Sequence, residues 1–250
     1  MANSELTVDV EQKPGATLPP RVSFSQMQLY QQCGLKYFFT YVAGWKELPT
    51  AALIGGNIAH DVVERLYRLP NHERTIERAR ELLREFGPRM LQRPDYAAHA
   101  QNNVMKQSVL EAVENLFQIE DPATLMVAPE HLEMQLDVEI NGVHFFGRVD
   151  RFTTDDGNRV TDYKTGKGPD RFVDDKFRQP YLYALAFKSQ YDIDIHEVEL
   201  IFLNAGRAVR RPVEPVQVVT MGEALATMRA GSQEDFTAST WGARLQPLCD

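Results

Sequence analysis

The stretch that decides the fold is GRVDRFTTDDGNRVTDYKTG, residues 147–166. Turn-forming residues (TDDGN) occupy its middle, and apolar or β-branched residues flank them on both sides, which predicts a β-hairpin. A hairpin centred on Asp156 places Asp150 directly opposite Asp162. Because side chains alternate along a strand, Lys164 shares their face and lies roughly 6–7 Å from Asp162.

The two facing carboxylates are the feature of this hairpin that calls for an explanation. Directly paired residues have Cβ atoms about 5 Å apart, and like charges at that distance destabilise a sheet. A divalent cation between Asp150 and Asp162 would remove the repulsion, with Lys164 as an adjacent fixed positive charge. The pattern therefore predicts a hydrolytic metal site. An ordinary ion pair between Asp162 and Lys164 is the alternative.

Composition limits the class of protein. With 250 residues, of which 43% are hydrophobic, the chain can bury a core as one domain or as one domain with an added part. No apolar run approaches the ~20 residues needed to span a bilayer, so we expect no membrane partner. Residues 1–20 are polar and lack the pattern of a signal peptide, which predicts a flexible N-terminal tail on a cytoplasmic protein.

The net charge of −8 argues against a strongly basic nucleic-acid-binding protein. Basic residues are nevertheless concentrated in two places, around the hairpin and further along the chain, where they could contact phosphates. Solvated surface charge is the alternative for each of them. The residues are Arg148, Arg151, Arg159, Lys164, Lys167, Arg171, Lys176 and Arg178, then Arg207, Arg210 and Arg211.

The periodicity of apolar residues predicts an α/β protein that begins with helices and continues as a sheet. Strict alternation over residues 132–140 predicts a half-buried strand, and Asn141-Gly142 predicts a two-residue turn into the next strand, giving a three-strand meander. Helices are expected over 26–41, 58–69, 73–86, 96–117, 176–190 and 222–230, a buried strand over 198–203 and an extended segment over 207–219.

With these segments in order, the chain resembles the PD-(D/E)XK nucleases, and specifically the RecB-like exonuclease branch that includes the CRISPR-associated RecB-like nucleases. Separated pieces carry the resemblance in the family's order. They are the opening helix with its cysteine (residues 25–37), GGNIAH (55–60), GRVD (147–150), DYKTG (162–166) and QPYLY (179–183). The superfamily's proline is absent, because Val149 precedes Asp150.

The resemblance implies a restriction-endonuclease-like core over residues 131–235, with residues 21–130 as a helical elaboration that carries the histidine motif. It implies a metal-dependent DNA exonuclease, acting on single-strand ends in DNA recombination, repair or phage DNA metabolism, with a separate helicase or recombination partner. Tyr30, Tyr37 and Phe38 are available to stack on bases, although their spacing favours core packing. A catalytically silent DNA-end-binding scaffold and a duplex endonuclease are the alternatives.

The resemblance also implies a metal site. Asp150, Asp162 and the backbone carbonyl of Tyr163 would bind Mg²⁺ or Mn²⁺, and His60 would complete the set. Hard oxygen ligands suit these ions, which can neutralise an anionic phosphodiester and activate water.

Three further residues have roles by resemblance. Lys164 would orient the attacking water or help to deprotonate it, and Gln179 and Tyr183 would support the site and the substrate. Glu133 lies on the polar side of its strand and could approach the site, but we expect it to be solvated.

Many members of the branch bind an iron–sulfur cluster through one cysteine in the first helix and three near the C-terminus. Cys33 matches the first and Cys249 a second, so residues 236–250 are either a shortened form or a remnant of such a region. Two thiolates do not meet the usual four-cysteine requirement, and we expect no cluster in this chain. If the two cysteines descend from such a site, their sulfurs should lie within about 10 Å, with Trp241 and Leu248 packed on the first helices.

Overall fold

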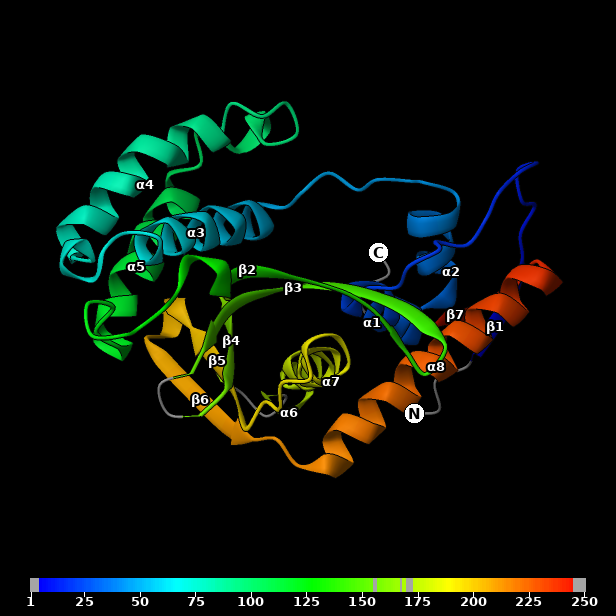
Figure 1. Cartoon of the computed structure of the whole chain (residues 1–250). Helices are drawn as coiled ribbons and strands as arrows, with labels where there is room; N and C mark the ends of the chain where they lie inside the picture. Colours follow the sequence, from blue (N-terminus) through cyan, green and yellow to red (C-terminus); the bar gives the residue numbers. More distant parts are fainter. Residues whose placement is uncertain (1–4, 155–156, 167, 170–172, 245–250) are drawn as a thin grey trace.

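The computed structural model describes residues 5–154, 157–166, 168–169 and 173–244. A five-stranded sheet of order β2-β3-β4-β5-β6 forms its centre, and strands β1 and β7 form a separate two-stranded ribbon (Figure 1). Of the neighbouring strands described in the large sheet, β4 and β5 pair in parallel and the other pairs are antiparallel. The expected mixed α/β class with a restriction-endonuclease-like core is confirmed.

The strands are β1 (Glu5–Asp9), β2 (Leu132–Ile140), β3 (Val143–Thr153), β4 (Arg159–Lys164), β5 (Glu197–Phe202), β6 (Arg207–Pro212) and β7 (Thr240–Arg244). The α-helices are α1 (Phe24–Gln32), α2 (Gly34–Tyr37), α3 (Ala51–Tyr67), α4 (Ile76–Met90), α5 (Asn103–Ile119), α6 (Val173–Lys176), α7 (Arg178–Tyr191) and α8 (Pro215–Ala238). The π-helix η1 (Phe38–Val42) continues α2. Among the described residues, no helix is long and apolar enough to cross a membrane.

The decisive hairpin has the predicted register. Arg151 pairs with Thr161, and Thr153 pairs with Arg159. The same register sets Asp150 opposite Asp162, although the ladder ends one pair earlier. At the turn between β2 and β3, Asn141 and Gly142 have φ values of 49° and 76°, the two positive values that a type I′ hairpin requires. Residues 155–156, at the centre of the predicted turn, lie outside the described residues.

The predicted first helix is divided at Cys33. This residue is extended (φ −164°, ψ 108°), and its Sγ accepts the backbone N–H of Lys36 at 3.4 Å, so it ends α1 and caps α2. The next residue lies against β7, because a Cβ atom at Gly34 would come within 3.2 Å of the carbonyl oxygen of Gly242. A contact across the whole chain therefore breaks a helix that local periodicity predicts as continuous.

Helix α3 begins earlier than predicted and contains the glycine pair within it. A Cβ atom would lie 3.2 Å from Met105 if added at Gly55, and 2.8 Å from Thr165 Oγ1 if added at Gly56. The glycines thus let α3 approach both α5 and the end of β4, despite their low helix propensity. At the other end of the chain, Glu214 caps α8 ahead of Pro215, so the predicted extended segment stops at β6.

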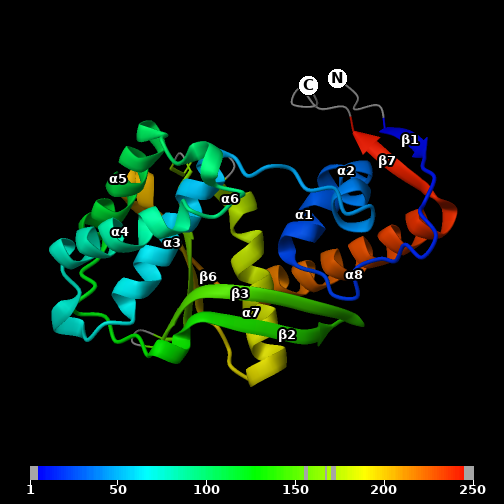
Figure 2. The same cartoon turned by 90° about the horizontal axis from the view of Figure 1, so that it is seen from above.

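The N-terminal segment that we expected to be a flexible tail contains strand β1, which pairs along its length with β7. Figure 2 shows this ribbon beside α2, on the side of the molecule away from α3, α4 and α5. Trp241 of β7 is fully buried, with its ring centroid 6.0 Å from that of Tyr37 and 5.3 Å from that of Phe38. These two aromatic side chains belong to the core, as their spacing favoured. Leu248 and Cys249 lie outside the described residues, so the distance between the two cysteines stays a prediction.

Two hydrophobic clusters meet at strands β4 and β5. One cluster joins α1, α7 and α8 to the sheet and includes Val160 and Leu200. The other joins α3, α4 and α5 and includes Tyr163 and Ile201. Because neighbouring residues of a strand point to opposite faces, each of these strands contributes to both clusters. The central strands are therefore covered on both sides, and Figure 1 shows α7 enclosed by the sheet and α8.

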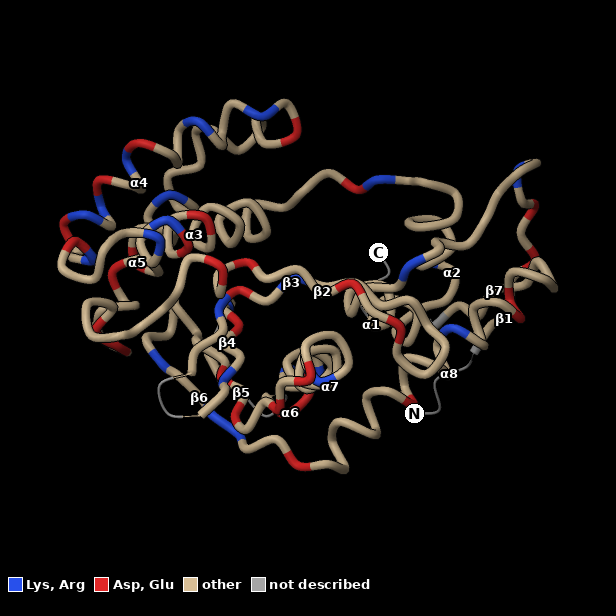
Figure 3. Tube along the Cα trace, viewed as in Figure 1, with Lys and Arg blue, Asp and Glu red and all other residues tan. Residues whose placement is uncertain are grey.

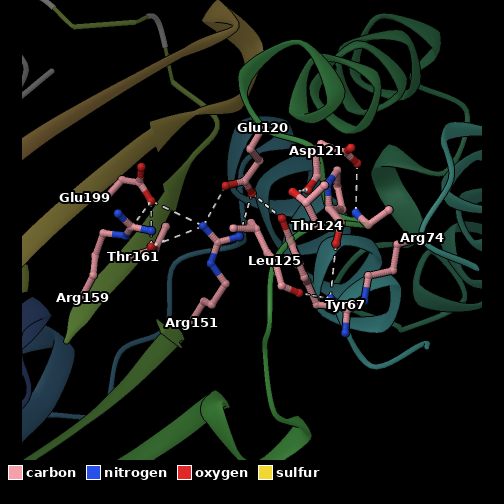
Figure 4. A network of polar contacts seen from close by, with 12 residues as sticks. Tyr67, Arg74, Glu120, Asp121, Thr124, Leu125, Arg151, Arg159, Thr161 and Glu199 are labelled. Carbon is pink, nitrogen blue, oxygen red and sulfur yellow. Dashed lines mark hydrogen bonds and ion pairs between the residues drawn. The ribbon is translucent and has the colours of Figure 1, made fainter. Parts of the chain in front are cut away.

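A buried ion network joins the helical layer to the sheet (Figure 4). The fully buried guanidinium of Arg151 donates to both carboxylate oxygens of Glu120, at 2.6 and 2.9 Å, and lies 3.4 Å from Glu199. Glu120 ends α5 and also accepts the hydroxyl of Tyr67 from α3. Burial would raise the pKa of Glu199, but Arg151 and Arg210 outweigh it and lower that pKa.

This network corrects part of the expectation for the basic residues around the hairpin. Arg151 and Arg159 are buried, the second within 3.0 Å of Glu197, so neither can reach a phosphate. Arg210 donates to Glu199 at 2.6 Å and completes the same network. Lys167 and Arg171 lie outside the described residues.

Arg151→Met should lower the free energy of unfolding by about 3–5 kcal/mol, because it leaves the carboxylate of Glu120 without its guanidinium partner and removes one of the guanidinium groups beside Glu199. Arg80→Met is the matched control, since Arg80 pairs with Glu114 at 2.7 Å with side chains 40% and 30% exposed. Loss of that pair should cost about 1 kcal/mol or less. Urea unfolding of both variants in chelator measures the difference. Equal losses would show that the buried network contributes no more than a surface pair.

Candidate active site

Two carboxylates, buried Asp162 and half-buried Asp150, meet a lysine at the end of β4. Lys164 Nζ lies 2.7 Å from Asp162 Oδ2 on the same strand. Asp150, at the facing position of β3, accepts the backbone N–H of Tyr163 at 2.7 Å. The backbone N–H of Tyr163 is thus bonded to the side chain of Asp150 and is not available for a further backbone pair between β3 and β4. This contact holds its carboxylate beside Asp162.

Helix α3 brings the histidine of the second motif to the same place. His60 Nδ1 lies 3.6 Å from Asp150 Oδ2, and its ring meets that of Tyr163 edge to face, with centroids 5.9 Å apart. The close approach depends on Gly56, where a side chain would collide with Thr165. The glycines and the histidine of GGNIAH therefore act together, since the glycines set the position of the helix that carries the histidine.

Helix α7 supports the lysine from the other side. Lys164 Nζ donates to Gln179 Oε1 at 3.0 Å, and Gln179 Nε2 donates to the hydroxyl of Tyr183 at 2.7 Å. A Cβ atom at Gly147 would lie 2.8 Å from the Tyr183 ring, so the glycine of GRVD makes room for this tyrosine. The structure brings together all the residues expected at a catalytic metal site. Cys33, proposed for a cluster, is not part of this group and caps α2 instead.

The two acids differ in their electrostatic environment. Burial would raise the pKa of Asp150, but His60, the Tyr163 N–H and Lys164 outweigh it and lower that pKa. The pKa of Asp162 is raised, because burial and the neighbouring Asp150 outweigh the attraction of Lys164. In the metal-free protein, the surroundings therefore favour the ionised form of Asp150, and the repulsion between the two acids falls mainly on Asp162. A bound cation would remove that repulsion.

The donor set fits Mg²⁺ or Mn²⁺, which prefer carboxylate and carbonyl oxygens. The carboxylates of Asp150 and Asp162, the carbonyl of Tyr163 and the imidazole of His60 could together hold such an ion. Among the described residues, no three His, Cys, Asp or Glu side chains stand in a metal-binding arrangement. The reason is that Asp162 turns toward Lys164 and Asp150 toward His60 and the Tyr163 N–H, so a metal must compete with these contacts.

Glu133 joins this group, contrary to the expectation that it is solvated. The register of β2 and β3 sets it opposite Asp150, and its backbone has a φ of 54°, which is unfavourable for a residue with a side chain. Its side chain is 15% exposed and lies 2.5 Å from Arg148 Nε. Burial and Asp150 raise the pKa of Glu133 to about 7. The alternation of apolar and polar residues predicts Glu133 on the polar side of β2. No local pattern indicates that Asp150 and Arg148 would cover this end of the strand.

Glu133→Gln should stabilise the metal-free protein at pH 8 and change its stability little near pH 4.5. The pKa of Glu133 is raised to about 7 in the folded protein, from 4.5 for an ordinary glutamate, so ionisation of Glu133 reduces stability as the pH rises between these values. Glutamine resembles the protonated acid and avoids this loss. Thermal unfolding in chelator across this pH range measures the effect.

Glu139→Gln is the matched control, because Glu139 is exposed on the same strand. A Glu133→Gln curve that runs parallel to that of the wild type over the whole range would contradict the raised pKa.

Comparison with known families agrees with this geometry. The family model of the PD-(D/E)XK nuclease superfamily matches residues 21–250. That range includes the hairpin acids, Lys164, the α3 histidine and the α7 glutamine. No curated protein matches the chain. The chain belongs to the PD-(D/E)XK nuclease superfamily.

Proposed function

We propose that this protein is a metal-dependent DNA exonuclease of the RecB-like branch that hydrolyses phosphodiester bonds from single-strand ends. Membership of the superfamily already indicates a nuclease. The observation that carries the finer proposal is the convergence of His60, Asp150, Asp162 and Lys164 on one end of β4, with Gln179 bonded to the lysine. DNA recombination, repair or phage DNA metabolism is the proposed setting, with a helicase or recombination protein as a separate chain.

The carboxylates of Asp150 and Asp162, the Tyr163 carbonyl and His60 would hold the ion, which supplies charge neutralisation and an activated water. Lys164 acts as a fixed positive charge in the metal-free protein. Burial would lower its pKa, but Asp162 outweighs burial and raises it, so the amine stays protonated. Of its two proposed roles, this favours orienting the water and stabilising charge on the phosphoryl oxygens over removing a proton.

Gln179 and Tyr183 position this ammonium group. The glutamine accepts from Lys164 and donates to the tyrosine, so the chain of contacts fixes the direction of the amide as well as its place. Their proposed role is therefore to hold Lys164 toward the substrate. The histidine motif together with this glutamine–tyrosine pair favours the exonuclease branch over a duplex endonuclease.

A catalytically silent DNA-end-binding scaffold is the second candidate. A DNA-binding scaffold has no need of a lysine next to two acids. The raised pKa of Asp162 indicates that the proximity of the two acids reduces the stability of the metal-free protein. Retention of all three groups supports the catalyst.

Asp162→Asn, Asp150→Asn and Lys164→Met should each reduce cleavage at least about 100-fold. Each aspartate variant removes a charged ligand of the ion, and Lys164→Met removes a positive charge that stabilises the phosphoryl oxygens in the transition state. The assay compares end-labelled single-stranded and duplex DNA, linear and circular, with Mg²⁺ or Mn²⁺. Asp192→Asn and Lys188→Met are the matched controls, since both residues lie on the surface away from the site. Degradation confined to linear single strands supports the proposal. Cleavage of circles would favour an endonuclease, and a wild type without activity would favour the scaffold.

Mn²⁺ should raise the melting temperature of the wild type. A ligand at ~100 times its Kd adds about 2.7 kcal/mol to the free energy of unfolding when it binds only the folded state. His60→Ala should weaken this stabilisation and Asp162→Asn should nearly remove it. A melting temperature that does not respond to millimolar Mn²⁺ would contradict the two-acid metal site.

A further inference from the structure

A cavity leads away from the catalytic acids along the β2–β3 hairpin. It has a volume of about 570 Å³ and is lined at its inner end by Asp150 and Tyr183. At its outer end lie Arg21 and Ser25, from the entry into α1, together with Arg148 and Phe146 of β3. A substrate held at Asp150 therefore has room to extend in this direction, between the hairpin and the start of α1.

A second cavity, of about 700 Å³, lies next to the first, and Ser25 lines both. It lies between α1, η1 and residues 43–50, the segment that connects η1 to α3. In Figures 1 and 2 this segment spans the distance between the two helical parts of the molecule. Trp45 and Lys46 of the connecting segment and Tyr41 of η1 line the cavity. Because the two cavities adjoin at Ser25, together they outline a path from Asp150 to the connecting segment.

The first part of the path presents guanidinium groups. The side chain of Arg148 is 67% exposed and pairs with Glu133 through Nε, while Arg21 pairs with Asp137 and lies over the Phe146 ring at 5.0 Å. A guanidinium has five N–H donors, so a single carboxylate contact leaves donors that can reach phosphate oxygens. The acids hold these arginines in place at the rim of the cavity.

The second part of the path presents an exposed aromatic face. Trp45 is 63% exposed and its ring stacks on Phe39, with centroids 4.7 Å apart and planes at 28°. One ring face is thus fixed against the protein, and the side chain borders the cavity. Aromatic side chains beside a cationic groove are how proteins bind single strands without regard to sequence, because only an unpaired base offers its face for stacking.

We propose that one strand of DNA follows this path from the catalytic acids, with Arg148 and Arg21 contacting its phosphates and Trp45 stacking on a base. The inference rests on the proposed nuclease function and adds the residues that select a single strand. Duplex DNA cannot stack its paired bases on Trp45, so the path favours single strands at the binding step, before any bond is broken.

Binding of oligothymidylate in chelator tests the path separately from catalysis. The chain has two tryptophans, and Trp241 is buried, so quenching of the exposed fluorescence reports on Trp45. Trp45→Ala should weaken binding about tenfold, within the range for loss of one stacked base, and Trp45→Phe should restore much of it. Because both variants lack the reporter, their binding is measured by the anisotropy of a labelled oligonucleotide. Leu48→Ala is the matched control, because Leu48 is 83% exposed in the same segment but lies outside the cavity lining.

Arg148→Ala should reduce the slope of log Kd against log salt concentration by about 0.7, the value for one phosphate contact with a single strand. Arg89→Ala, which removes an exposed arginine paired on α4, should leave the slope unchanged. Equal binding of duplex and single strands, or an unquenched Trp45 in a protein that binds the oligonucleotide, would overturn the path. Quenching without cleavage in Mn²⁺ would sustain the path and refute the nuclease function, and cleavage without quenching would do the reverse.

Discussion

The buried ion pair between Arg151 and Glu120 is the constraint on which the rest of the structure depends. It joins the end of α5 to β3, and Tyr67 brings α3 into the same network. Arg151 pairs with Thr161 across the strands, in the last ladder pair before the two acids. Neighbouring side chains of a strand point to opposite faces of the sheet. The ion network therefore holds the hairpin on one face, next to the position where the carboxylates lie on the other face.

At the site, the carboxylates of Asp150 and Asp162 repel each other, and each is stabilised by different neighbouring groups. The negative charge of Asp150 is stabilised by His60 and a backbone N–H, while that of Asp162 is stabilised by Lys164. Three elements of distant sequence supply these groups, so the charge balance exists only in the folded chain. A cation that displaced the lysine from Asp162 would free the ammonium for an anionic substrate. The ion pair between Lys164 and Asp162 thus stabilises the metal-free protein and keeps the ammonium group close to the place where a substrate would bind.

Local chemistry was enough to predict the register of the hairpin, because turn residues and alternation act within a few positions. The same reasoning found Asp150, Asp162 and Lys164, and the resemblance added His60. It failed where distant segments decide the outcome. Gly34 lies against β7, so a helix breaks next to it, and Glu5–Asp9 form a strand because β7 is available to pair with them. Glu133 was assigned to solvent because no local pattern records that its end of β2 is covered.

The glycines of the motifs owe their place to packing rather than to phosphate binding. A side chain at Gly56 or Gly147 would collide within 2.8 Å with Thr165 or Tyr183 respectively. The first glycine lets α3 reach the end of β4, and the second lets α7 lie against β3. His60 can therefore approach Asp150, and Gln179 can approach Lys164, because these two positions carry glycine and leave room for the helices. In GGNIAH, the histidine and the glycine that lets its helix approach the end of β4 lie only four residues apart.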